Sequence, residues 1–135
     1  MIPKPKKRKK SQRTALAGRA MKLWGQIVHA REAKCECEGW NDLECGGPLQ
    51  AAHGLSRRKT RDYQHVDPGN GFLLCRDHHC QMGTASPAWL LFLKHQWGES
   101  AFWYRMRAAD HGELPTVAGY RDRIARFEAE LKEMG

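Results

Sequence analysis

The central part of the chain, from Cys45 to Cys80, reads CGGPLQAAHGLSRRKTRDYQHVDPGNGFLLCRDHHC. It is dense in Gly, Cys and His and carries no helical stripe of apolar residues. Two short apolar pieces, Leu49 to Ala52 and Phe72 to Leu74, lie on either side of a long polar loop. Since short apolar runs bounded by turn residues are typical of strands, we expect two strands joined by this loop.

Helices are expected on both sides of this stretch. From about Thr14 to Ala33, apolar residues recur at steps of three and four, which is the stripe of an amphipathic helix. Ser86 followed by Pro87 is typical of a helix N-cap with proline at the first helical position. Similar stripes predict further helices over about 100–109 and after Pro115. The sequence therefore predicts an α+β fold, with a core over about 35–85 and helical flanks over 14–33 and 86–134.

Length and charge limit the organisation of the chain. With 135 residues it is long enough for one compact domain, which we place at 13–135. Residues 1–12 are rich in Lys, Arg and Pro with almost nothing apolar, and we expect a flexible basic arm. The net charge of +8 favours a polyanionic partner, although an arm that only confers solubility remains open.

Five cysteines gather around the histidines of the central stretch. An odd number in a reducing compartment favours metal binding over disulfides, with free thiols as the alternative. No apolar run approaches the roughly 20 residues that cross a bilayer, and the charged N-terminus does not resemble a signal peptide. We therefore expect a soluble, cytoplasmic protein without a membrane partner and without a small-molecule cofactor.

The central stretch resembles the HNH nuclease family. The features that carry the resemblance are Cys45-Gly46, His53, Asn70 and the run LCRDHH over 74–79, which stand where the family has a CG knuckle, a catalytic His, an Asn and an LCxxCH motif. The segments AAHGLSRR and DPGN especially resemble segments of the HNH proteins of bacteriophages, including the NinG recombination-protein family. The resemblance covers about 14–110, and for a phage-encoded protein it implies the cytoplasm of the host.

What the resemblance implies is a small zinc-stapled ββα-metal core that cuts DNA with one divalent cation, Mg2+, Mn2+ or another ion. His53 would be the general base, and imidazole is the side chain best matched to that task near neutral pH. His79 would bind the catalytic ion, with His53 as a further candidate ligand. Asn70 would either bind the ion or orient the catalytic histidine, and both roles stay open.

One family ligand is absent from this chain. Many family members carry Asp or His directly before the catalytic histidine, where this sequence has Ala52. The side chains in the connecting loop that could replace it are Asp62, His65 and Asp67. Alternatively, His53 itself binds the metal and another group activates water.

A second, structural metal site follows from the cysteines. Tetrahedral sites of Cys and His stabilise small domains, and Cys45, Cys75 and His78 are the best three zinc ligands. The usual CxxC before the knuckle is absent, so we favour Cys37 as the fourth ligand, with Cys35 and Cys80 as alternates.

A basic loop follows His53, and its side chains could neutralise DNA phosphates, although a merely solvated loop is the alternative. Its members are Arg57, Arg58, Lys59 and Arg61. Together these features predict a metal-dependent HNH endonuclease, either nicking or cutting both strands. The alternative function is a zinc-stabilised nucleic-acid-binding module whose HNH site has decayed.

Overall fold

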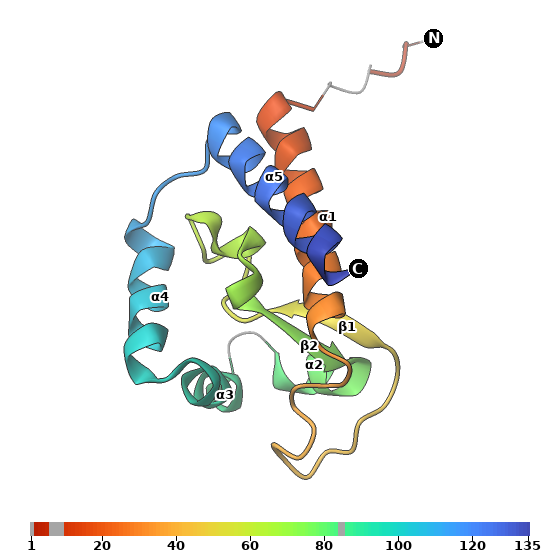
Figure 1. Ribbon diagram of the computed structural model, residues 1–135, viewed down its shortest axis with the longest axis vertical. Coiled ribbons are helices and arrows are strands. Elements are labelled where there is room, and N and C mark those ends of the chain that lie inside the picture. The colour runs from red at the N-terminus through yellow and green to blue at the C-terminus, as the bar shows by residue number, and fades with distance from the viewer. Residues whose placement is uncertain (1, 6–9, 84–85) are drawn as a thin grey trace.

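The computed structural model describes residues 2–5, 10–83 and 86–135, and over these residues the chain is an α+β protein with five α-helices and one two-stranded sheet (Figure 1). The elements follow in the order α1 Gln12–Arg31, β1 Leu49–His53, η1 Tyr63–Val66, η2 Pro68–Asn70, β2 Gly71–Cys75, α2 Arg76–Met82, α3 Pro87–Trp97, α4 Glu99–His111 and α5 Val117–Met134. The expected α+β class, with helices on both sides of the central stretch, is confirmed. No helix among these residues is long and apolar enough to cross a membrane.

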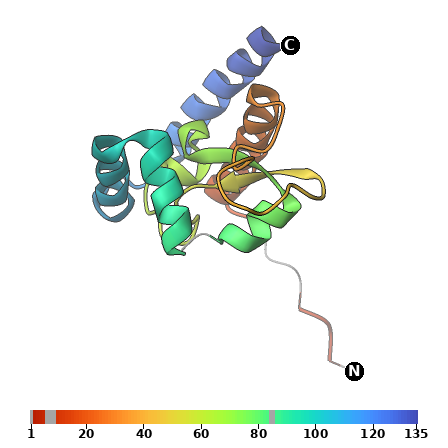
Figure 2. The same cartoon turned by 90° about the horizontal axis from the view of Figure 1, so that it is seen from below.

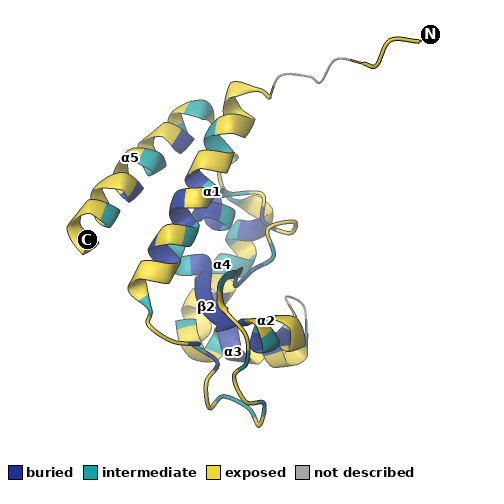
Figure 3. Cartoon of the chain, turned by 90° about the vertical axis from the view of Figure 1, so that its right-hand side faces the viewer, coloured by how far each residue is buried: buried dark blue, intermediate teal, exposed yellow. Residues whose placement is uncertain are grey.

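Helix α1 is the long N-terminal element, and it begins two residues before the predicted start. The Ser11 side chain accepts a hydrogen bond from the backbone N–H of Thr14 and caps the helix. The apolar stripe forms the buried face of α1, which packs along α5 and reaches the sheet (Figure 3). Of the predicted basic arm, residues 1 and 6–9 lie outside the described part of the chain.

Strands β1 and β2 form an antiparallel pair in which Leu49 faces Cys75 and His53 faces Gly71. All five residues of β2 are buried. A side chain at Gly71 would collide with Trp24 and Val28, so α1 approaches the backbone at this end of the sheet. The pairing therefore puts His53 at one end of the sheet and Cys75 at the other, where the chain enters α2.

Helix α2 lies inside the stretch that showed no helical stripe in the sequence. It is seven residues long, too short for an apolar periodicity to be visible, and Cys75 caps it by accepting from the N–H of His78. Helix α3 begins at Pro87 with Ser86 as its cap, as the sequence predicted.

Two main hydrophobic clusters stabilise the protein. One joins the sheet and the turn that carries Cys35 and Cys37 to α3 and α4, with Phe72, Trp89 and Phe92 in contact at its centre. The other lies between α1, α5 and η1. Seen from below, the C-terminal end of α5 projects away from the side of the molecule where α2 lies (Figure 2). The α1–α5 pair is thus stabilised by contacts other than those around the cysteines.

Candidate functional site

Four potential metal ligands from separate parts of the chain meet beside the start of α2. They are Cys35, Cys45, Cys75 and His78, and their ligand atoms all lie within 4.8 Å of one another. Cys75 ends β2, and His78 lies in the first turn of α2. Backbone hydrogen bonds from Asp77 to Gly46 and from Arg76 to Pro48 hold the Cys45 loop against this turn. A Cβ at Gly46 would meet the Asp77 carboxylate, so the knuckle passes close to the first turn of α2.

The distances in this cluster suit a tetrahedral zinc site. Tetrahedral bonds of about 2.3 Å to sulfur and about 2.0 Å to nitrogen place the two atoms about 3.6 Å apart. The Nδ1 atom of His78 lies 3.6 Å from Sγ of Cys35, 3.6 Å from Sγ of Cys45 and 3.1 Å from Sγ of Cys75. Three thiols and one imidazole are also a common donor set for structural zinc. These side chains are therefore close enough to hold a metal such as zinc.

Neighbouring groups favour the metal-binding protonation states of two of these ligands, His78 and Cys75. The Nε2–H group of His78 donates to Oδ1 of Asn41 over 3.1 Å, which leaves the lone pair on Nδ1, the atom that faces the sulfurs. Burial opposes ionisation of the Cys75 thiol, but hydrogen bonds from the backbone N–H groups of His78 and Gly46 favour it, and the pKa of Cys75 is lowered to about 6. Both effects favour the protonation states that zinc requires.

The fourth member of the cluster is Cys35, and the preferred sequence assignment, Cys37, is corrected. Glu36 is hydrogen-bonded to Leu73 of β2 through its backbone N–H and through its carboxylate, at 2.8 Å and 2.6 Å. This pairing brings Cys35 beside Cys75. The chain then turns, and Cys37 is fully buried in the hydrophobic cluster, where burial raises its pKa to about 12. Cys80, the other alternate, is exposed and lies outside the cluster.

A second site lies at the opposite end of β1, where His53 and His79 line the same cavity. The cavity has a volume of about 650 Å³, and its walls are formed by Ala51, Ala52, His53, Ser56, Arg57, Arg58 and His79. None of the described residues that line it is an Asp or a Glu. The structure thus brings together two of the three HNH residues expected from the sequence, along with two arginines of the basic loop.

His53 is held in one orientation. Its ring stacks on that of Trp24 with centroids 4.1 Å apart and an angle of 7° between the planes. Its Nε2 lies 2.8 Å from the carbonyl oxygen of His65, and because a carbonyl only accepts, Nε2 carries the proton. Burial lowers the pKa of His53 below its ordinary value, and the charges of Arg57 and His79 act in the same direction. His53 is therefore neutral at neutral pH, with Nδ1 free to accept a proton.

His79 is oriented by a residue of the sheet. Its Nδ1 lies 2.8 Å from Oε1 of Gln50, so Nδ1–H donates and Nε2 keeps a lone pair. Gln50 is on β1, three residues before His53. Sequence reasoning missed Gln50, and also Trp24 and Asn41, because their roles depend on contacts 29, 29 and 37 residues away in the chain.

Asn70 is fully buried and does not line the histidine cavity. Its side-chain oxygen accepts from the N–H of Leu55 at 2.6 Å, and its amide donates to the carbonyls of Leu55 and Gln64. The Asn70 carbonyl also accepts from the N–H of Gly54. Asn70 therefore fixes the turn that follows His53. Its candidate role as a metal ligand is corrected, since backbone groups already occupy its side chain.

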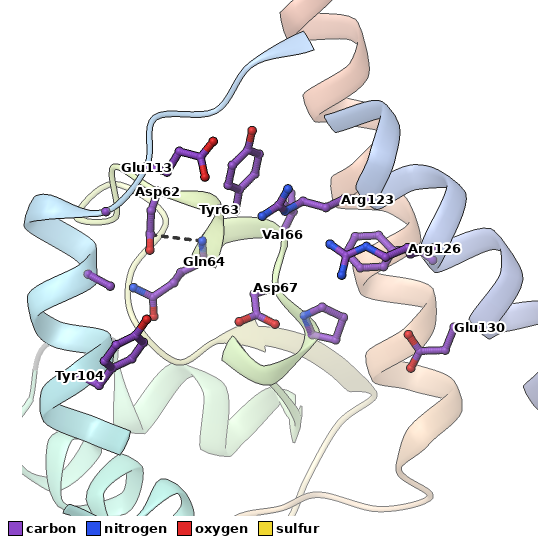
Figure 4. A pocket seen from close by; sticks show the side chains of 14 residues that line it. Asp62, Tyr63, Gln64, Val66, Asp67, Tyr104, Glu113, Arg123, Arg126 and Glu130 are labelled. Atoms are coloured by element: carbon purple, nitrogen blue, oxygen red, sulfur yellow. Dashed lines mark hydrogen bonds between the residues drawn. The ribbon is translucent and has the colours of Figure 1, made fainter. Parts of the chain in front are cut away.

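The three loop residues that could have replaced the ligand missing at Ala52 are also engaged elsewhere. Asp62 caps η1, and Asp67 caps η2 and pairs with Arg105 at 3.0 Å. Both line a different cavity, between η1, η2, α4 and α5 (Figure 4). His65 donates from Nδ1 to the Asp62 carbonyl and accepts at Nε2 from the Tyr120 hydroxyl. None of the three lines the His53 cavity, so they do not supply the absent ligand there.

The four basic residues of the loop after His53 lie on different parts of the surface. Arg57 and Arg58 line the histidine cavity, whereas Lys59 and Arg61 line neighbouring hollows. All four are exposed, so they meet phosphates at low desolvation cost.

Comparison of the chain with known protein families, curated proteins and solved structures finds no match. What this site can do chemically therefore rests on its own geometry.

Proposed function

We propose that this protein is a metal-dependent DNA endonuclease of the HNH type with a ββα-metal core. The observation that carries the proposal is that His53, at the end of β1, and His79, on α2, line one cavity together with Arg57 and Arg58. The order strand, loop, strand, helix agrees with the motif resemblance in the sequence. An oriented base, a free metal-binding nitrogen and two cations are the components that phosphodiester hydrolysis needs.

His53 would act as the general base. With Nε2–H donated to the His65 carbonyl, Nδ1 is the atom that takes the proton from the attacking water. The stacked Trp24 ring and the turn fixed by Asn70 hold the imidazole in position. Because burial lowers the pKa of His53, the base form predominates at neutral pH.

His79 would hold a divalent cation through Nε2, while Gln50 fixes the ring. When bound, such an ion stabilises the negative charge on the phosphate and on the leaving oxygen. The donors in this cavity are imidazole nitrogens without a carboxylate, a set that favours transition ions such as Mn2+ or Ni2+ over Mg2+. Arg57 and Arg58 would neutralise the phosphates beside the scissile bond.

Zinc in the four-residue cluster would be structural. Four protein ligands close the tetrahedron, whereas a catalytic zinc site keeps an open position for water. His78 and His79 are adjacent on α2, so the zinc site would also fix the helix that presents His79. The two sites would thus have separate roles on one short helix.

The test is cleavage of supercoiled plasmid DNA by the zinc-loaded protein. Wild type, His53→Ala and the control His111→Ala, an exposed histidine on α4, are compared with Mg2+, Mn2+, Ni2+ or EDTA. We expect ion-dependent nicking or double-strand cutting by wild type and by the control, and none by His53→Ala. Zinc content and thermal unfolding of each variant establish that the fold is intact. Equal cutting by His53→Ala would contradict the proposal.

The second candidate function is a zinc-stabilised nucleic-acid-binding module with a decayed HNH site. The observation that favours it is that no described residue lining the histidine cavity carries a carboxylate, and that Ala52 stands at the place of a family ligand. In the same experiment, tight DNA binding without cutting in any of the ions would identify this function.

A further inference from the structure

We propose that the DNA is held along a second contact surface, outside the histidine cavity, on the N-terminal half of α1. This inference rests on the proposed function for its substrate class and adds the path that the DNA takes across the protein. The surface, called here the α1 track, has at its centre Lys10, Arg13, Thr14, Gly18 and Arg61.

The α1 track is continuous with the histidine cavity. Arg57 lines that cavity and also lines a hollow of about 480 Å³, whose walls include Lys10, Thr14 and Gly18. This hollow in turn shares Thr14 and Ala17 with a third one of about 360 Å³, which Arg13 and Arg61 line. A polynucleotide that leaves the His53 site past Arg57 therefore enters a depression that leads along α1.

The charge of this surface has one sign. Over residues 2–5, 10–83 and 86–135, no carboxylate lines any of the three hollows, and neither Lys10, Arg13, Arg57 nor Arg61 forms an ion pair. The cavity of Figure 4 is different, since Asp62, Asp67, Glu113 and Glu130 line it together with two arginines. Phosphates are therefore attracted to the α1 track, whereas the carboxylates of the other cavity repel them.

The shape of α1 also suits close approach of a phosphate backbone. The track face of the helix carries Thr14, Ala17 and Gly18, and a Cβ added at Gly18 would meet no atom within 4 Å. Because these three residues are small, the helix surface is recessed between Lys10 and Arg13 on one side and Arg57 on the other. From Gln12 to Met21 the helix spans about 14 Å at the helical rise, which corresponds to about four base-pair steps of DNA.

The test is DNA binding in the His53→Ala background, so that nothing is cut. The probe is a fluorescein-labelled duplex several helical turns long, and its affinity is measured by anisotropy over a series of salt concentrations. For the double variant Lys10→Ala, Arg13→Ala we expect binding weaker by roughly tenfold and a slope of log K against log salt that is smaller by about two. The control variants are Arg107→Ala, whose side chain is exposed on α4 and lines none of these hollows, and Arg126→Ala in the cavity of Figure 4.

A second pair of variants adds charge without removing a contact. Gly18→Glu puts a carboxylate in the α1 track and, being at an exposed helical position with open space, should not disturb the fold. Ala30→Glu puts the same charge on an exposed position of α1 outside the track. We expect only Gly18→Glu to weaken binding several-fold. Equal affinity of both glutamate variants, with an unchanged salt slope in the double variant, would overturn the α1 track.

The two proposals fail separately. If wild type nicks plasmid but the track variants bind like wild type, the track is refuted and the nuclease stands. If no ion supports cutting but the track variants lose affinity relative to their controls, the track stands and the nuclease is refuted.

Discussion

The Nε2–H group of His78 is fixed by Asn41, and this contact predicts a measurable effect on zinc. Replacing Asn41 with Leu removes the acceptor, so that the ring no longer favours the tautomer that directs Nδ1 at the sulfurs. Loss of such a partner lowers metal affinity by about ten- to a hundredfold. Competition with a chromophoric chelator measures it. Gln81→Leu, which removes only the partner of the Asn41 amide, is the control and should bind zinc nearly as wild type does.

The pKa of His53 sets the acid side of the pH profile of cutting. Burial lowers this pKa from its ordinary value of 6.5, so the neutral base survives to a lower pH than a free histidine would. At saturating divalent ion, the rate should be constant near neutral pH and fall as pH drops, with its midpoint below 6.5. A series of single-turnover nicking rates against pH checks this, and a midpoint at or above that value would contradict it.

The choice between Cys35 and Cys37 shows where residue-level prediction stops. The two cysteines are separated only by Glu36, so spacing alone did not discriminate them. What decides is the pairing of Glu36 with Leu73, a contact across 37 positions of sequence. By contrast, Cys45, Cys75 and His78 were predictable, because a knuckle glycine and the start of a helix fix their local geometry.

Asn70 links the start of β2 to the turn after β1, and its removal should affect this element strongly. Asn70→Ala eliminates three side-chain hydrogen bonds and leaves the buried N–H of Leu55 without its acceptor. We expect the free energy of unfolding to fall by about 2–4 kcal/mol. Urea unfolding measures this, with Gln96→Ala, an exposed amide on α3, as the control.

The same variant should also reduce cutting at temperatures where it remains folded, because His53 precedes the turn that Asn70 holds. Zinc content should stay unchanged, since none of the four cluster residues contacts Asn70 through a hydrogen bond. A stable variant with full activity would show that this turn does not position His53.

Elements with their own local signals were predictable, and elements fixed by distant contacts were not. Ser86 and Pro87 predicted the start of α3, and the apolar stripe predicted both ends of α1 to within two residues. Helix α2 could not be predicted from periodicity, because the one buried apolar side chain among its seven residues is that of Met82. The two 3-10 turns of the connecting loop, η1 and η2, were also missed, since aspartate caps and the Arg105 contact hold them.

On the scale of the whole molecule, the sequence predicted a core with helical flanks but not how the flanks meet. Helices α1 and α5 lie at opposite ends of the chain, yet they pack along each other and share a hydrophobic cluster with η1. The apolar stripe of each helix predicts which of its faces is buried, but it does not predict which other helix that face contacts. The pairing leaves the other face of α1 exposed beside Arg57, and this is why the α1 track exists only in the folded molecule.

The contribution of the basic N-terminal residues to DNA binding can be separated from that of the α1 track. Deleting residues 1–9 removes five lysines and arginines but leaves Lys10 and Arg13. Since each phosphate contact contributes about 0.9 to the salt slope, we expect weaker DNA binding with a smaller slope, and unchanged zinc content. Cutting at low salt should be retained, because His53, His79, Arg57 and Arg58, which line the histidine cavity, are all kept. Anisotropy with the duplex described above measures the affinity, and unchanged binding over the whole salt range would mean that the arm does not contact DNA.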